Sequence, residues 1–83
     1  MISEAQNDIA ELHMRKAGKE NLSMLQGNTE EVLSIDDHKL HLDEHIAFML
    51  GGEYEKYKHD EHIKQLFLNH INEHKKMIEQ GEN

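Results

Sequence analysis

Apolar residues recur along most of the chain at intervals of three and four, the spacing that places side chains on one face of an α-helix. The first series predicts a helix over about residues 3–26, with Ser3 as its N-cap and Gly27-Asn28 as its stop signal. Gly18 lowers the helix propensity locally, so a kink there is compatible with the pattern. The shared face carries Ile2, Ala5, Ile9 and Leu12.

A connector over residues 28–35 follows this helix. The second helix is expected over about residues 35–50, because Ser34 and Asp37 have the spacing of a capping box and Gly51-Gly52 is a stop signal. The connector contains apolar side chains that favour packing against the helices, namely Val32, Leu33 and Ile35.

The third helix is expected over about residues 57–78, with Asp60 and Glu61 in its first turn, where carboxylates favour the helix dipole. No stretch alternates in the manner of a strand, and proline is absent. The sequence therefore predicts an all-α fold in a single small domain. Residues 1–27 are expected to form its N-terminal helix and residues 28–83 a histidine-rich helical hairpin.

The second and third helices are expected to pack antiparallel, because the connection between them is short. In such a hairpin His45 would lie level with His62, and His38 level with His70, to within about one helical turn. The core of this hairpin would be thin, since only 36% of the residues are apolar and tryptophan is absent. We therefore expect the chain to form an oligomer.

Histidines share the predicted buried faces of both helices with leucine, isoleucine, phenylalanine and methionine. The simplest interpretation is that the rings are neutral packing residues, each hydrogen-bonded to a carboxylate, a carbonyl or another histidine. Asp37, Glu44 and Glu73 are close enough in sequence to be such partners. The histidines expected to fix the helix register in this way are His38, His41, His45, His62, His70 and His74.

A metal site is the alternative that the spacing of the histidines supports. His41 and His45 are four residues apart, and so are His70 and His74, which places each pair on one side of its helix. Two such pairs facing each other would supply four imidazole nitrogens, a ligand set suited to zinc or nickel. No other cofactor is indicated by the sequence.

Catalytic interpretations of the same residues are weaker. The motif HxxEH occurs twice, at residues 41–45 and 70–74, and matches an inverted zinc-protease signature. A third ligand and a substrate cleft are not evident, and a haemerythrin-like di-iron bundle would need a fourth helix and more carboxylate ligands. We therefore expect that the protein is not an enzyme.

Composition narrows the range of partners. The formal net charge of −8 disfavours binding to the phosphate backbone of nucleic acids and to anionic membrane surfaces. No apolar run approaches the roughly 20 residues of a membrane-spanning helix. Cysteine is absent, which excludes disulfides and thiolate ligands and leaves histidine as the specialised ligand.

An ordered series of short motifs resembles the C-terminal region of tailed-bacteriophage portal proteins, the head–tail connectors. The resemblance covers about residues 15–78 by eye. The series consists of Lys19-Glu20-Asn21, Met24, Gly27, Val32, Asp36-Asp37-His38, His41, Glu44-His45, Phe48-Met49, His70-Ile71 and Glu73-His74.

The resemblance implies a structural role in virion assembly through helix-mediated contacts, with the protein itself or other phage structural proteins as partners. It places the chain in the cytoplasm of a bacterial host, or in the virion if the chain is part of a portal. It assigns no catalytic role to the histidines. A metal-binding helical module, and a stand-alone acidic phage protein that docks on a host factor, remain as alternatives.

Overall fold

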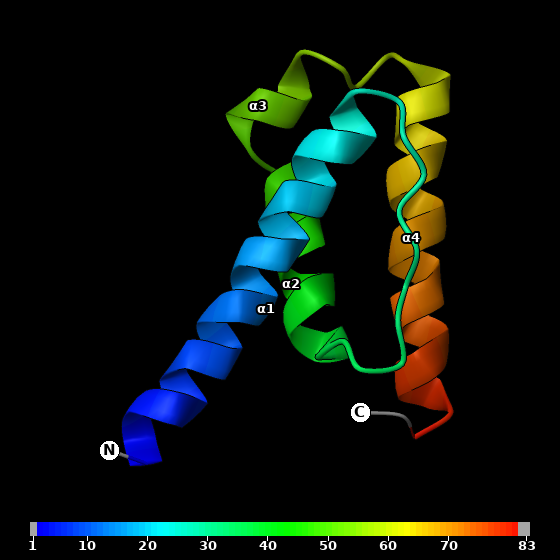
Figure 1. Ribbon diagram of the computed structural model, residues 1–83. Coiled ribbons are helices and arrows are strands. Elements are labelled where there is room, and N and C mark those ends of the chain that lie inside the picture. Colours follow the sequence, from blue (N-terminus) through cyan, green and yellow to red (C-terminus); the bar gives the residue numbers. More distant parts are fainter. Residues whose placement is uncertain (1, 82–83) are drawn as a thin grey trace.

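The computed structural model describes residues 2–81 of the chain, with side chains from residue 8 onward. Four helices form the fold, α1 (Ile2–Leu25), α2 (His38–Met49), α3 (Gly52–Glu55) and α4 (Glu61–Glu79), and no strand occurs within residues 2–81. The predicted all-helical class is therefore confirmed. Figure 1 shows α1, α2 and α4 packed side by side, with the first half of α1 projecting beyond the other helices.

Helix ends follow the local signals closely. α1 ends as predicted, because Gly27 adopts a positive φ of 91° and the amide of Asn28 donates to the carbonyl of Ser23 over 3.2 Å. The helix passes Gly18 without interruption, so the weak propensity there produces no break. Packing of the following turn over α2 and α4 offsets the small cost of one glycine.

The second and last helices begin three or four residues later than expected, at His38 and Glu61 rather than near residues 35 and 57. In each case the side chain of an aspartate accepts a hydrogen bond from the backbone amide three residues later. Asp37 accepts from Leu40, and Asp60 accepts from Ile63. Asp60 is thus the N-cap, and not a residue of the first turn.

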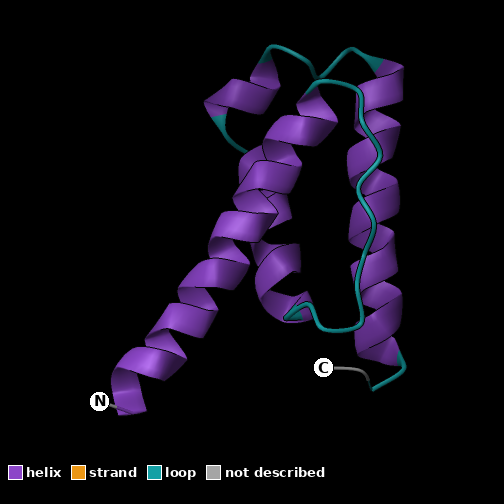
Figure 2. Ribbon diagram, in the orientation of Figure 1, coloured by secondary structure: helices purple, strands orange, loops and turns teal. Residues whose placement is uncertain are grey.

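The connection between α2 and α4 is longer than predicted, because the short helix α3 and its flanking turns occupy residues 50–60. The connector before α2 runs in extended form beside α4 (Figure 2). Val32 and Leu33 are partly buried there, but the expectation for Ile35 was wrong, since this side chain is 78% exposed. Asp36 is buried in its place.

The interior has an apolar part and a polar part. The apolar part lies where α3 covers α1 and α4, and Phe67 is at its centre, stacked on Phe48 and edge-on to Tyr54. Its buried members are Met24, Tyr54, Ile63 and Phe67. The polar part lies between α1, α2 and α4. Its buried members are five histidines (His38, His41, His45, His70 and His74) together with Glu20, Asn21 and Asp36.

A candidate metal centre

Five ionisable side chains from three helices converge in the polar part of the interior. One potential ligand atom from each lies within 4.8 Å of the corresponding atom of every other. All five residues are buried, with at most 4% of the surface of each residue exposed. The set consists of Glu20 from α1, His41 and His45 from α2, and His70 and His74 from α4; we call it the His4Glu cluster.

The carboxylate atom Glu20 Oε1 is at the centre of the cluster. It lies 3.3 Å from His41 Nδ1, 3.2 Å from His45 Nε2 and 3.3 Å from His70 Nε2. None of these contacts has the geometry of a hydrogen bond, and Oε1 and the three nitrogens are buried without such a partner among the described residues. Buried polar atoms are nearly always paired, so this group of atoms requires an explanation.

In two of these rings, by contrast, the other nitrogen is hydrogen-bonded to an oxygen atom outside the cluster. His70 Nδ1 lies 2.9 Å from the backbone carbonyl of Glu30, and His45 Nδ1 lies 2.7 Å from Asn21 Oδ1. A carbonyl oxygen only accepts, so His70 must carry its proton on Nδ1. In the neutral ring Nε2 then carries a lone pair, and this atom lies 3.3 Å from Glu20 Oε1.

The fourth ring is oriented by another histidine. His74 Nδ1 lies 2.9 Å from His38 Nδ1, and both rings are fully buried. When His74 is the donor of this hydrogen bond, its Nε2 is left as a lone pair, and this atom has no hydrogen-bond partner within the described part of the chain. His38 therefore supports the cluster from outside and is not one of its five members.

The electrostatics of the cluster favour an ionised Glu20 beside neutral His45 and His74. Burial and repulsion by the neighbouring histidines lower the pKa of His74 to about 3, and burial also lowers the pKa of His45. Burial by itself raises the pKa of Glu20, but N–H groups of the surrounding imidazoles and the Lys16 ammonium lower it by a larger amount when they donate to the carboxylate, so the net shift is downward. At neutral pH an ionised carboxylate oxygen therefore lies 3.3 Å from the lone pair of His70 Nε2, an arrangement that a cation between them would stabilise.

The separations also suit a metal ion. Two ligands with bonds of about 2.0–2.1 Å at a tetrahedral angle lie roughly 3.3–3.4 Å apart, close to the Glu20–histidine distances. A trans pair would be about 4.2 Å apart, so the widest pair would contract by at most about 0.6 Å on binding. In metal-binding histidines the N–H group of the second ring nitrogen typically donates a hydrogen bond to a carbonyl or a carboxylate, as that of His70 does here.

A second group, His13, Asp36 and His41, adjoins the first but lacks the features of a metal site. The amide of Asp37 donates to His13 Nδ1 over 3.4 Å, so a neutral His13 ring carries its proton on Nε2. Asp36 Oδ1 already accepts from Lys16 Nζ over 2.9 Å, and Asp36 Oδ2 accepts from the amide of Leu33. Lys16 thus supplies the cation at this position.

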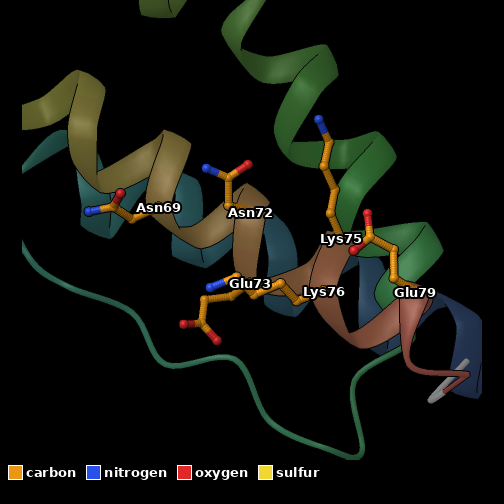
Figure 3. A pocket seen from close by; sticks show the side chains of 6 residues that line it. All are labelled: Asn69, Asn72, Glu73, Lys75, Lys76 and Glu79. Atoms are coloured by element: carbon orange, nitrogen blue, oxygen red, sulfur yellow. The ribbon is translucent and has the colours of Figure 1, made fainter.

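Two surface hollows reach the His4Glu cluster on either side of the connector. One is lined in part by His70, Glu30 and Glu73, and the other by Glu20, Lys16 and Glu30. Both hollows carry carboxylates, and the second is also lined by Lys16 and Lys19. A third hollow, on the exposed face of α4 (Figure 3), is lined by residues of mixed charge: Asn69, Asn72, Glu73, Lys75, Lys76 and Glu79.

The structure brings together all four histidines that the spacing selected as metal ligands, His41, His45, His70 and His74. It adds Glu20, to which sequence reasoning gave no role, although the segment Lys19-Glu20-Asn21 belongs to the motif series described above. Two of the carboxylates expected as histidine partners, Glu44 and Glu73, do not contribute to the cluster. Asn21 and the carbonyl of Glu30 hold ring nitrogens instead.

The expected register of the histidines differs from the observed one. His45 faces His70, with ring centroids 4.6 Å apart, about two turns from the expected His62. His38 faces His74, which is one turn from the expected His70 and within the stated tolerance. His62 is exposed and contacts the carbonyl of Gly27 at 3.3 Å, so it is not an interior packing residue. The longer connection through α3 accounts for this difference, because it allows α2 and α4 to pack in another register than a short turn would.

Comparisons with family models, with curated proteins and with solved structures found no match. The search of the described helices for a membrane-spanning segment was also negative, because none combines sufficient length with sufficient apolar character.

Proposed function

We propose that the chain is a metal-stabilised helical module that binds one divalent transition-metal ion of the zinc or nickel class in the His4Glu cluster. The observation that carries this proposal is the ring of His70. Its Nδ1 is tied to the carbonyl of Glu30, so its Nε2 is presented as a lone pair to an ionised carboxylate. Four imidazoles and one carboxylate converging in this way form a ligand set for a first-row metal.

The role we propose for the ion is structural and not catalytic. The ligands come from all three long helices and are buried, which is the character of a closed site. The apolar part of the core is small, and a domain of this size often depends on a metal or a partner chain for stability. The binding free energy of the ion would then contribute directly to folding.

Metal analysis and thermal melting of untagged protein test the proposal. We expect about one equivalent of bound metal and a melting temperature that falls when a chelator is added. His70→Ala should abolish both effects. His62→Ala is the matched control, because it removes an exposed histidine from the same helix and should change neither. Protein without stoichiometric metal, and with a melting temperature insensitive to chelator and to added zinc or nickel, would rule the function out.

We propose as a second function helix-mediated self-association, the assembly role that the resemblance to portal proteins implies. Its support is the projecting first half of α1 (Figure 1), where Ile9 is 58% and Leu12 59% exposed. Two apolar side chains one turn apart on an unpacked helix favour contact with a second copy of the chain.

Light scattering coupled to size exclusion tests this assembly role. We expect an oligomer in the wild type and a monomer in the double variant Ile9→Glu/Leu12→Glu. Leu50→Glu is the control, because Leu50 is 83% exposed and lies elsewhere on the surface. A wild-type monomer across a wide concentration range would exclude self-association.

A further inference from the structure

Lys16 joins the His4Glu cluster to the start of α2. Its ammonium lies 2.7 Å from Glu20 Oε2 and 2.9 Å from Asp36 Oδ1. Both carboxylates are buried, whereas Lys16 is partly exposed. The two oxygens of Glu20 therefore have different environments: Oε1 faces the imidazoles and Oε2 is engaged by a cation.

This asymmetry bears on how Glu20 would bind a metal ion. For both oxygens to bind one ion, Oε2 would have to turn away from Lys16 and leave the ammonium without its nearer carboxylate. The Lys16 position is itself fixed by Asp36, whose other oxygen accepts from the backbone amide of Leu33. Rotation of Glu20 would thus disturb a chain of charge-assisted hydrogen bonds that extends into the connector.

We infer that Lys16 restricts Glu20 to a single metal–oxygen bond and thereby sets the coordination number of the bound ion at five, with four nitrogens and one oxygen. This inference rests on the proposed metal-binding function and extends it to the geometry of the site. Lys16 is a positioning residue, because it acts through Glu20 and does not contact the ion.

The choice of metal follows from the coordination number. Zinc has no geometric preference from its d electrons, so its usual four ligands can expand to five. Nickel favours tetragonal or six-coordinate surroundings, which a one-oxygen glutamate and four imidazoles do not complete. Freed from Lys16, Glu20 could supply its second oxygen as a sixth ligand. The structure therefore assigns zinc over nickel to the natural site, with Lys16 as the residue that determines the selectivity.

Cobalt(II) substitution and competition binding test the role of Lys16. The variant Lys16→Met keeps a side chain of similar length without charge, Lys16→Arg restores a cation, and Lys19→Met is the matched control, an exposed lysine on the same helix. We expect a five-coordinate cobalt spectrum in the wild type, in Lys16→Arg and in Lys19→Met. Lys16→Met should give the weaker spectrum of a six-coordinate ion and a preference for zinc over nickel reduced by about tenfold.

Each outcome separates this inference from the proposed function. Wild-type protein that binds no metal overturns the function, and the inference with it. One bound equivalent with the same cobalt spectrum and the same zinc-to-nickel preference in the wild type and Lys16→Met overturns the inference alone. If Lys16→Met does not fold, X-ray absorption on the zinc-loaded wild type decides: five nearest ligands support the inference, and six refute it.

Discussion

His38 Nδ1 lies 2.9 Å from His74 Nδ1 in the interior of the protein, so one of the two rings donates a hydrogen bond to the other. Metal binding at His74 Nε2 requires that His74 be the donor, and His38 is then the acceptor that fixes the tautomer of a ligand. The four histidines of the His4Glu cluster and His38 account for all five buried imidazoles among the described residues.

Replacement of His38 by phenylalanine should weaken metal binding without removing a ligand. The ring volume is largely kept, but His74 loses the acceptor of its Nδ1 proton. We expect the dissociation constant for zinc to rise about 10- to 100-fold, the usual effect of losing such a partner. Isothermal titration measures it, with the exposed His59→Phe as control. An unchanged dissociation constant in His38→Phe would show that the hydrogen bond does not orient the ligand.

The metal-free protein should lose stability as the pH falls. Burial and the surrounding imidazoles lower the pKa of His74 from 6.5 to about 3, so between these values the unfolded chain binds a proton that the folded chain does not. The free energy of unfolding is therefore not reduced by this group above pH 6.5. Below pH 6.5 the group lowers the free energy of unfolding by up to about 1.4 kcal/mol per pH unit. His45 acts in the same direction, because burial lowers its pKa also.

Chemical denaturation of chelator-treated protein at a series of pH values measures this dependence. His74→Phe should flatten the curve below pH 6.5, because the group that takes up the proton is gone. A free energy of unfolding that stays constant between pH 7 and pH 5 would contradict the expected protonation.

Phe67→Ala should show how far the fold depends on its apolar part. Phe67 is fully buried against Phe48 and Tyr54, and such a truncation typically costs about 3–5 kcal/mol. We expect the variant to be largely unfolded without metal and to refold when zinc is added, since a ligand that binds only the folded state stabilises it. Circular dichroism with and without zinc follows both steps. A helical signal that is unaffected by zinc would show that metal binding does not contribute to folding.

Gly18→Ala should stabilise the protein. Gly18 lies inside α1 with a helical conformation, and a β-carbon added there would meet no atom within 4 Å. Alanine has the higher helix propensity, so we expect a gain of about 0.5–1 kcal/mol in the free energy of unfolding. Denaturant titration measures the gain. A loss of stability would mean that the glycine has a role that its surroundings do not explain.

The sequence by itself predicted the three long helices and the pairing of histidines within α2 and α4, but not the short helix α3. Stop and cap signals such as Gly27 act over a few residues, and the four-residue spacing of His41 and His45 guarantees a shared helix side. Both are local properties, because the helical period alone determines which side chains lie on one face. They do not depend on what the helix later packs against.

The tertiary structure decided which of these faces meet and what completes the site. Glu20 comes from a third helix, and nothing local distinguishes it from the other glutamates of an acidic chain. The register that pairs His45 with His70 depends on the length of the turn through α3 and on how α2 and α4 pack. A cluster drawn from three helices results from long-range packing, which cannot be predicted from the local pattern of residues.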